Sequence, residues 1–514
     1  MAIQSDWKTT IIAELKLRRK EISLTEISMA KPTKILFLGT YPPRRCGIAT
    51  FTYDLAQAFN SVFVPAIKAV VAAMNFNALK KPKYASSQVI LEIDQDRIDD
   101  YKMAAQKINA DPYIKLVCIQ HEFGIFGGVF GAHLKHFLDE LRKPVVMTLH
   151  TVLPNPEQAM DESLRPLLGR VSYLVVMSQN SKEILISQYG INPRKIFVID
   201  HGIHLVEFES SERFKKGLGL ENREVISTFG LLNSGKGIEY VLDVIPELIQ
   251  KFPDLLYLVI GATHPLVLKN EGEKYRNFLL DKVYKLKIQK HVHFYNRYLE
   301  TDHLLKLLQA TDIYIAPSIN VNQAVSGTLS YAMGTGRPVI SSPFAQAKED
   351  VGNAGFLVDS RDKDSLRRII ERLLSNPRLR EVMGRKAYFN TRHMVWHNVA
   401  LSYLKVFMKC APSLSVDNRH LPKLNLKHLR KLTDNFGIFQ FADLSRKNPD
   451  FGYTLDDNAR ALIIAAKYYS AGIKKKSTVR LLNIYLSFIE NSLKRDGFLN
   501  YFGKNYKLDN TANK

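Results

Sequence analysis

Ser326, Gly327 and Thr328 open a short predicted helix whose first turn has the chemistry to bind an anion. They lie in the stretch from Asn320 to Phe344, in which a loop precedes the helix and a strand follows it. The first turn of a helix has unpaired backbone N–H groups and the positive end of the helix dipole, and small residues let a phosphate approach those groups closely. The alternative is an ordinary Ser/Thr cap. The pattern therefore predicts a phosphate site or a helix cap here.

Gly47 is a second position at which the backbone can approach a ligand. The apolar run 34–39 is suited to a buried parallel strand, the loop 41–50 follows it, and a helical pattern covers residues 51–59. This arrangement places Gly47 at the start of a helix after a strand, although the loop is not a GxGxxG fingerprint.

Polar residues follow several of the predicted strands. His121 and Glu122 follow one strand, His150 follows another and Ser178 follows a third. Because the carboxyl ends of parallel strands meet at the edge of the sheet where ligands bind, these side chains are expected to lie together. A single histidine at such a position is more often structural, so these residues are candidates rather than assignments.

The elements that position these residues recur at the spacing of α/β proteins. Strand-like apolar runs cover residues 34–39, 67–72, 116–119, 145–149, 173–177 and 196–199, and then residues 225–230, 255–260, 292–294, 313–318, 338–340 and 355–358. Helical patterns lie between most of them, which predicts parallel sheets with right-handed crossovers.

The segment from Ala332 to Ile340, AMGTGRPVI, resembles the nucleotide-binding half of the retaining glycosyltransferases of family 4. The resemblance covers about residues 34–408. It implies an α/β protein with two facing Rossmann-like domains, the GT-B fold, followed here by a short C-terminal helical extension. The family pattern has two glutamates before this segment, and this chain has Gln323 and Tyr331 in their places.

The resemblance assigns roles around the donor. Gln323 takes the place of a contact to the donor sugar and can still exchange hydrogen bonds with it. Tyr331 takes the place of the carboxylate that holds the nucleotide ribose, so either the donor is held differently or it has no ribose. Gly261, Arg297 and Tyr298 correspond to the loops that contact the nucleoside.

The resemblance also places cationic and acceptor-side residues. Lys236 and Gly237 match a Lys-Gly pair that binds the donor diphosphate, but the arginine that accompanies this pair is Leu231 here. Gly47 corresponds to a glycine that faces donor phosphate or acceptor, and His150 to a histidine that meets the donor sugar. His121 and Glu122 are expected on the acceptor side.

The chemistry implied is sugar transfer with retention of configuration and without a protein nucleophile. The departing phosphate takes the acceptor proton while the protein positions the substrates and stabilises charge on the leaving group. Lys236 and the amides of Ser326, Gly327 and Thr328 would do the latter, with His150 and Gln323 at the sugar. The nucleotide sugar is a co-substrate, and neither a cofactor nor a metal ion is predicted.

Two rival functions stay open. A phosphorylase with the same fold would use a sugar 1-phosphate and no nucleotide, which suits the loss of both glutamates and the arginine. A homologue without catalytic activity would only bind glycan or nucleotide.

The expected organisation is a basic N-terminal appendage at 1–33, an acceptor domain at 34–210, a nucleotide-sugar domain at 222–395, a helix crossing back at 396–410 and a partial helical domain at 425–514. The phrase from Phe451 to Arg460, FGYTLDDNAR, resembles the first hairpins of (α/α) toroid glycan-processing domains. A toroid needs several times the residues present, so a truncated domain is expected.

Composition limits the partners. The 514 residues are 46% hydrophobic and carry a formal net charge of +22. The basic residues are scattered and match no zinc-finger, RRM or helix-turn-helix pattern, so nucleic acid is an unlikely partner. The partners expected are a nucleotide-sugar donor, a glycan or lipid-linked acceptor and an anionic membrane surface in peripheral contact. Three separated cysteines, no apolar run of about 20 residues and no secretory signal predict a cytoplasmic protein.

Overall fold

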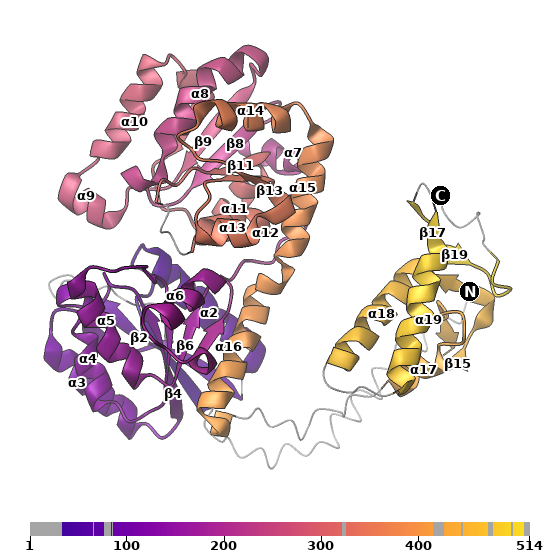
Figure 1. Cartoon of the computed structure of the whole chain (residues 1–514), viewed down its shortest axis with the longest axis horizontal. Helices are drawn as coiled ribbons and strands as arrows, with labels where there is room; N and C mark the ends of the chain where they lie inside the picture. Colours follow the sequence, from indigo (N-terminus) through magenta and orange to yellow (C-terminus); the bar gives the residue numbers. More distant parts are fainter. Residues whose placement is uncertain are drawn as a thin grey trace, which may run out of the picture. The chain divides into compact units, whose positions relative to one another are not determined.

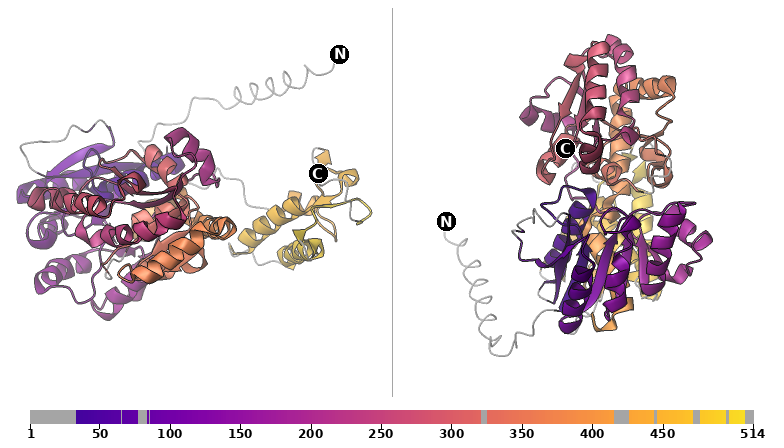
Figure 2. Two further views of the ribbon diagram at one scale, coloured as in Figure 1. Left: turned by 90° about the horizontal axis from the view of Figure 1, so that it is seen from above. Right: turned by 90° about the vertical axis from the view of Figure 1, so that its left-hand side faces the viewer.

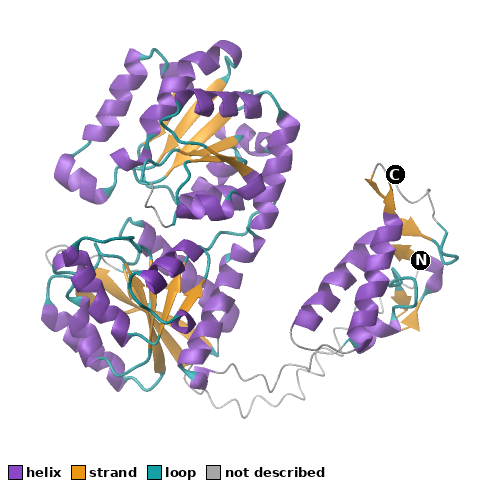
Figure 3. Ribbon diagram, viewed as in Figure 1, coloured by secondary structure: helices purple, strands orange, loops and turns teal. Residues whose placement is uncertain are grey.

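The computed structural model describes residues 33–64, 66–76, 84, 86–320, 325–414, 426–443, 446–470, 476–494 and 497–507. The chain divides into two compact units, Met1–Val416 and Asp417–Lys514. The first unit contains two domains, each built on a parallel sheet with helices on both faces (Figures 1 and 3).

The sheet of the first domain has seven parallel strands in the order β3-β2-β1-β4-β5-β6-β7. The strands are β1 Thr33–Gly39, β2 Ile67–Asn75, β3 Val89–Asp94, β4 Ile114–His121, β5 Val145–Leu149, β6 Tyr173–Val176 and β7 Ile196–Val198. The helices that connect them are α2 Gly47–Phe63, α3 Ile98–Ala110, α4 Leu134–Glu140, α5 Gln158–Arg170 and α6 Gln179–Ser187.

Apolar side chains on both faces of the strands explain why this sheet is buried. Along β1, Leu36 and Leu38 belong to one hydrophobic cluster, and Ile35 and Phe37 belong to another. Successive side chains of a strand point to opposite faces, so a continuous apolar run requires cover on both sides. Helix α2 covers the second face together with α16, Trp396–Cys410.

The sheet of the second domain has six parallel strands in the order β10-β9-β8-β11-β12-β13. Its strands are β8 Glu224–Phe229, β9 Leu255–Ile260, β10 Val292–Tyr295, β11 Ile313–Ala316, β12 Val339–Ser341 and β13 Gly355–Leu357. Its helices are α7 Ser211–Lys215, α8 Ile238–Lys251, α9 Pro265–Glu271, α10 Lys274–Lys285, α11 Thr301–Gln309, α12 Gly327–Gly334, α13 Ala345–Asp350, α14 Lys363–Leu374 and α15 Pro377–Asn390.

The chain crosses between the domains twice, and the two crossings are bonded to each other. The Ile203 amide donates to the Met394 carbonyl at 2.8 Å, and the Trp396 amide donates to the Ile203 carbonyl at 3.0 Å. Helix α16 then returns along the first domain (Figures 1 and 2). Its Phe407 packs on Phe37 and Phe59. The first domain is therefore completed by a helix from the far end of the unit.

The second unit is a small domain with two long helices that pack on each other. Its helices are α17 Lys427–Lys431, α18 Leu455–Ser470 and α19 Lys476–Ser492, and its short strands are β14 Ala442–Asp443, β15 Arg446–Lys447, β16 Tyr453–Thr454, β17 Leu493–Lys494, β18 Gly497–Phe498 and β19 Tyr501–Phe502. The resemblance to a toroid stays a prediction. Over the described parts of the chain, none of the helices is both long and apolar enough to cross a membrane.

The structure confirms the predicted pair of Rossmann-like sheets. Each strand-like run named from the sequence overlaps an observed strand. Strand β3 was not predicted; it lies at the edge of its sheet and alternates partly buried with exposed residues before Ile93 and Asp94. The predicted N-terminal appendage lies outside the described residues except for Thr33.

Candidate active site

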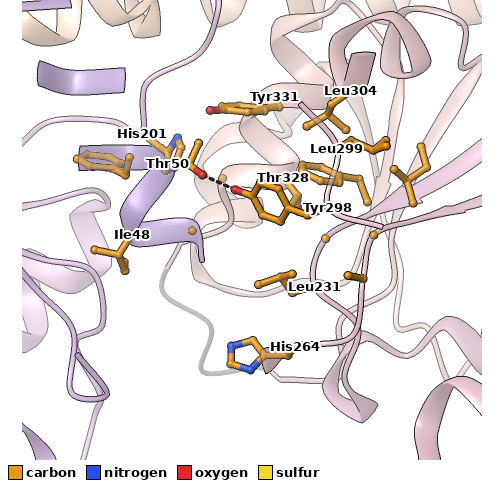
Figure 4. Close-up of a pocket in the computed structure, with 18 of the residues that line it drawn as sticks. Ile48, Thr50, His201, Leu231, His264, Tyr298, Leu299, Leu304, Thr328 and Tyr331 are labelled. Atoms are coloured by element: carbon orange, nitrogen blue, oxygen red, sulfur yellow. Dashed lines mark hydrogen bonds between the residues drawn. The ribbon is translucent and has the colours of Figure 1, made fainter. Parts of the chain in front are cut away.

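A cavity of about 390 Å³ lies between the two domains of the first unit (Figure 4). The first domain contributes the start of α2 and the ends of β4, β5 and β6. The second domain contributes the loops after β8, β9 and β10 and the start of α12. The carboxyl edges of both sheets therefore face one space, which is where open α/β sheets bind ligands.

Glycines line both walls of this cavity. Gly230 and Gly261 have φ angles of 141° and 139°, and a Cβ on Gly261 would lie 2.1 Å from the Gly230 carbonyl oxygen. On the opposite wall, a Cβ on Gly47 would meet no atom within 4 Å. Gly261 is therefore fixed by backbone packing, whereas Gly47 leaves open space for a ligand.

Lys236 brings a positive charge to the start of α12. A Cβ on Gly230 would lie 3.1 Å from the Lys236 ammonium nitrogen and 3.4 Å from the Thr328 methyl carbon, so both side chains surround Gly230. Burial lowers the pKa of Lys236. Over the described residues, no carboxylate forms an ion pair with this ammonium group. The cation is therefore poorly compensated and favours an anion in the cavity.

The start of α12 presents two backbone amides. The Ser326 amide donates to the Gln346 side chain, and the Ser326 hydroxyl accepts from the Leu329 amide at 3.3 Å. The first intrahelical bond runs from Ser330 to Ser326, so the Gly327 and Thr328 amides belong to the unpaired first turn. Gly327 and Thr328 line the cavity, and the buried Ser326 serves as the cap.

Neutral histidines form the wall from the first domain. His150 lines the cavity and donates from Nε2 to Gln120 at 2.9 Å; burial lowers its pKa to about 3. His201 donates from Nδ1 to the Gly202 carbonyl at 2.8 Å, and burial lowers its pKa to about 4. The His201 Nε2 therefore has a free electron pair. A Cβ on Gly327 would lie 2.6 Å from that atom, so the ring contacts the tip of α12.

Glu122 is the carboxylate on this wall. Its oxygens accept from the Thr151 hydroxyl at 2.6 Å and from the Phe123 amide at 3.0 Å. Burial raises its pKa despite these bonds. His121 does not line the cavity; it is 1% exposed and stacks on Phe126 beneath the wall. Glu122 is thus the member of this predicted pair that lines the cavity.

Hydroxyl groups of residues that line the cavity also join the two domains. Tyr298 and Thr50 form a hydrogen bond of 2.5 Å between their hydroxyls (Figure 4). The Tyr331 hydroxyl donates to Asp54 at 3.1 Å, and His204 lies 3.2 Å from both. Tyr331 is therefore held by the first domain at the place where the family pattern has a carboxylate.

The structure gathers most of the predicted site residues. Gly47, Glu122, His150, Lys236, Gly261, Arg297, Tyr298, Gly327, Thr328 and Tyr331 line the cavity. Gly237 does not; its φ of 64° and the 2.2 Å approach of its Cβ position to the Pro317 carbonyl fix the start of α8. Gln323 lies outside the described residues.

The sequence analysis assigned no site role to several cavity residues, among them Thr50, His201 and His264. His264 lies in the loop after β9, four residues beyond the end of the strand, and its place after a predicted strand is the signal that could have found it. Among the residues with described positions, no three His, Cys, Asp or Glu side chains are grouped to hold a metal ion.

Two family models match the first unit. The model described as Glycosyltransferase Family 4 matches residues 47–207, and the model described as Glycosyl transferases group 1 matches residues 210–389. A D-inositol 3-phosphate glycosyltransferase of Corynebacterium efficiens is 25% identical over 280 residues, which span 50% of this chain and 64% of that relative.

Solved structures share the fold. Sucrose-phosphate synthase from Thermosynechococcus elongatus superposes with a TM-score of 0.61 at 15% identity, over 74% of this chain and 100% of that one. Anabaena HepE in complex with UDP has a TM-score of 0.58 at 18% identity, over 73% of this chain and 100% of that one. With both halves of the cavity matched by glycosyltransferase models, the chain belongs to the family 4 glycosyltransferases of the GT-B fold.

Proposed function

We propose that this glycosyltransferase moves a sugar from a nucleoside-diphosphate sugar to a hydroxyl of a glycan or lipid-linked acceptor, with retention of configuration. The donor diphosphate would lie against Lys236 and the amides of Gly327 and Thr328. The acceptor would lie on the opposite wall beside Glu122. A lipid-linked acceptor would bring the chain, with its formal net charge of +22, to an anionic membrane surface.

The observation that carries this proposal is the position of the Lys236 ammonium group beside the first turn of α12. Both partners carry positive charge or partial charge, and both face the same cavity. These two positive groups stabilise an anion that enters the cavity. They stabilise it more when negative charge develops on a departing diphosphate. Leaving-group stabilisation is thus the contribution that the second domain makes to the transition state.

The first domain supplies polar groups of low charge. His150 and His201 are neutral because burial lowers their pKa values to about 3 and about 4. A neutral wall can exchange hydrogen bonds with sugar hydroxyls without competing with Lys236 for the diphosphate. Glu122 can accept a hydrogen bond from an acceptor hydroxyl and so fix its direction of approach.

The nature of the donor is supported by the structural neighbour that binds UDP. Gly261, Arg297 and Tyr298 line the cavity at the ends of β9 and β10, where the base and ribose would extend from the diphosphate.

The test is a panel of UDP-, GDP- and ADP-sugars with product analysis by mass spectrometry and the anomeric configuration read by NMR. We expect one nucleotide sugar to be turned over, and Lys236→Ala to reduce kcat/KM by about 100-fold or more because one charged contact to the leaving group is lost. Lys285→Ala, at an exposed lysine of α10, is the matched control. Turnover that is equal in Lys236→Ala and Lys285→Ala would contradict the proposal.

A phosphorylase is the second candidate, and two observations favour it. Leu231 lines the cavity without charge, and the Tyr331 hydroxyl is engaged by Asp54. Thermal stabilisation by a nucleoside diphosphate, with none from inorganic phosphate or a sugar 1-phosphate, would exclude the phosphorylase. The reverse pattern would exclude the nucleotide-sugar donor.

A further inference from the structure

His264 lies beside Lys236 at the end of a neighbouring strand. The parallel register of β8 and β9 continues past both strands, since Leu232 pairs with Thr263 and the His264 amide donates to the Leu232 carbonyl at 2.9 Å. In this register Leu231 and His264 lie on the face opposite to Leu232 and Thr263. Leu232 points into the core, and both Leu231 and His264 line the cavity (Figure 4).

Lys236 is a cation that acts on His264 from within the cavity. Lys236 lies on the 3-10 helix Ser234–Lys236, and its charge lowers the pKa of His264 after burial, which is the larger cause. Arg276 of α10 and Glu273, the residue before this helix, form an ion pair at 3.2 Å, and Glu273 also accepts a hydrogen bond from Thr263. Glu273 and Arg276 are therefore engaged with each other, whereas Lys236 acts on His264.

The donor proposed above carries a diphosphate, which has more negative charge than one lysine compensates. The cavity residues after β8, β9 and β10 include Lys236, His264 and Arg297 in that order across adjacent strands. Leu231, which shares a face with His264, contributes no charge. A positive charge between the loops of Lys236 and Arg297 can therefore come from His264.

We propose that His264 binds the donor diphosphate as an imidazolium ion together with Lys236, and that it takes up a proton when the donor enters. This inference rests on the proposed function, because it assumes a diphosphate in the cavity. Leu231 and His264 are alternatives for this charge: an arginine at position 231 would make the protonation of His264 unnecessary.

The direction of the pH dependence follows from the charges. In the empty cavity, burial and Lys236 favour the neutral ring. A bound diphosphate favours the charged ring, so the complex holds one more proton than the free protein. Donor affinity should then fall as the pH rises from about 6 to about 8, by up to about tenfold per pH unit within the range where the proton is lost.

The experiment measures UDP-glucose, GDP-mannose and ADP-glucose binding by calorimetry from about pH 6 to about pH 8, in buffers of different ionisation enthalpy. The wild-type protein should take up protons on binding. His264→Gln, which keeps a hydrogen-bond donor but cannot titrate, should bind about tenfold more weakly at the low end and lose the pH dependence. Circular dichroism checks that the variant is folded.

Rescue distinguishes a charge at this place from a structural role. Leu231→Arg combined with His264→Gln should recover the affinity and bind independently of pH. His293→Gln, at an exposed histidine of β10 in the same sheet, should keep the wild-type dependence. If His264→Gln binds the donor with the same affinity and the same pH dependence as the wild type, this inference is overturned and the proposed function is not. Failure of all three nucleotide sugars to bind would overturn the proposed function and this inference together.

Discussion

Burial keeps three histidines of the first domain neutral. One of them, His121, does not line the cavity. His121 is 1% exposed, both of its ring nitrogens lack a hydrogen-bond partner among the described residues, and its pKa is lowered to about 4. His150 and His201 have pKa values lowered to about 3 and about 4 by the same cause. Each must gain a proton when the domain unfolds below its unfolded-state pKa of about 6.5.

The first prediction concerns acid stability. Between about pH 6.5 and about pH 4 the unfolded chain binds more protons than the folded one, so the free energy of unfolding falls as the pH falls; above this window the contribution is complete. For His121 alone the expected slope is about 1.4 kcal/mol per pH unit. His121→Phe should flatten the pH dependence of thermal unfolding by one proton and raise stability near its lower end.

Two comparisons make this result specific. His121→Leu tests the same charge with a smaller side chain, in case phenylalanine overfills the site. His397→Gln, at an exposed histidine of α16, should leave the slope unchanged. A slope that stays the same in both His121 variants would show that this ring is not a source of acid lability.

At the residue scale, sequence reasoning found positions that follow strands but not their distant partners. Lys236, Thr328 and His150 could be named because each follows a strand or opens a helix. The contact between Tyr331 and Asp54 joins residues 277 apart in the chain, and no local pattern encodes it. His201 was not predicted as a site residue, since its place in the cavity wall depends on the contact with Gly327, which is distant in the sequence.

At the scale of elements, glycines at two helix starts have opposite reasons to be there. Gly237 precedes α8 with a φ of 64°, and its Cβ would lie 2.2 Å from the Pro317 carbonyl oxygen. Gly47 begins α2 beside open cavity. The first glycine is needed by the fold, and the second leaves room for a ligand.

The second prediction compares alanine at these two positions. Gly237→Ala should lower the free energy of unfolding by about 1–3 kcal/mol, because both the backbone conformation and the contact with Pro317 are strained. Gly47→Ala should leave stability unchanged or slightly higher, because alanine favours a helix, and should raise KM for donor or acceptor. Thermal denaturation and steady-state kinetics separate the two effects. A Gly47→Ala protein with unchanged kinetics would show that a ligand does not use this space.

The elements themselves were largely predictable because buried parallel strands are long apolar runs. Strand β3 was not predicted because an edge strand is half exposed, so its sequence VILEID lacks the continuous apolar pattern. Helix α16, which returns to the first domain after the second chain crossing, was predicted from the family resemblance. Its packing on Phe37 and Phe59 is a tertiary contact that the helix sequence alone does not specify.

At the scale of the whole first unit, two separate contacts link the two domains. Thr50 and Tyr298 share a hydrogen bond in the wall of the cavity. The Glu349 carboxylate of α13 accepts from the Gln179 and Asn180 amides at the start of α6, at 2.9 Å each. The chain crossings at Ile203 and Met394 lie between the domains and are bonded to each other. We expect these crossings to act as the hinge when the domains move apart.

The third prediction is that Glu349 stabilises the closed arrangement. A carboxylate at a helix start gains from the amides and the helix dipole, and at an exposed site this contact contributes about 1 kcal/mol, or about fivefold in an equilibrium between open and closed forms. Glu349→Ala should therefore raise the donor KM about fivefold and increase the radius of gyration measured by small-angle X-ray scattering, while the thermal stability of each domain is kept.

Glu381→Ala, at an exposed glutamate of α15 that pairs only with Arg385 among the described residues, is the control. Because donor binding would restore closure, the scattering difference between Glu349→Ala and the wild type should shrink when nucleotide sugar saturates both. A variant whose radius and KM equal those of the wild type would mean that the hinge and the remaining hydroxyl contacts hold the domains closed without Glu349.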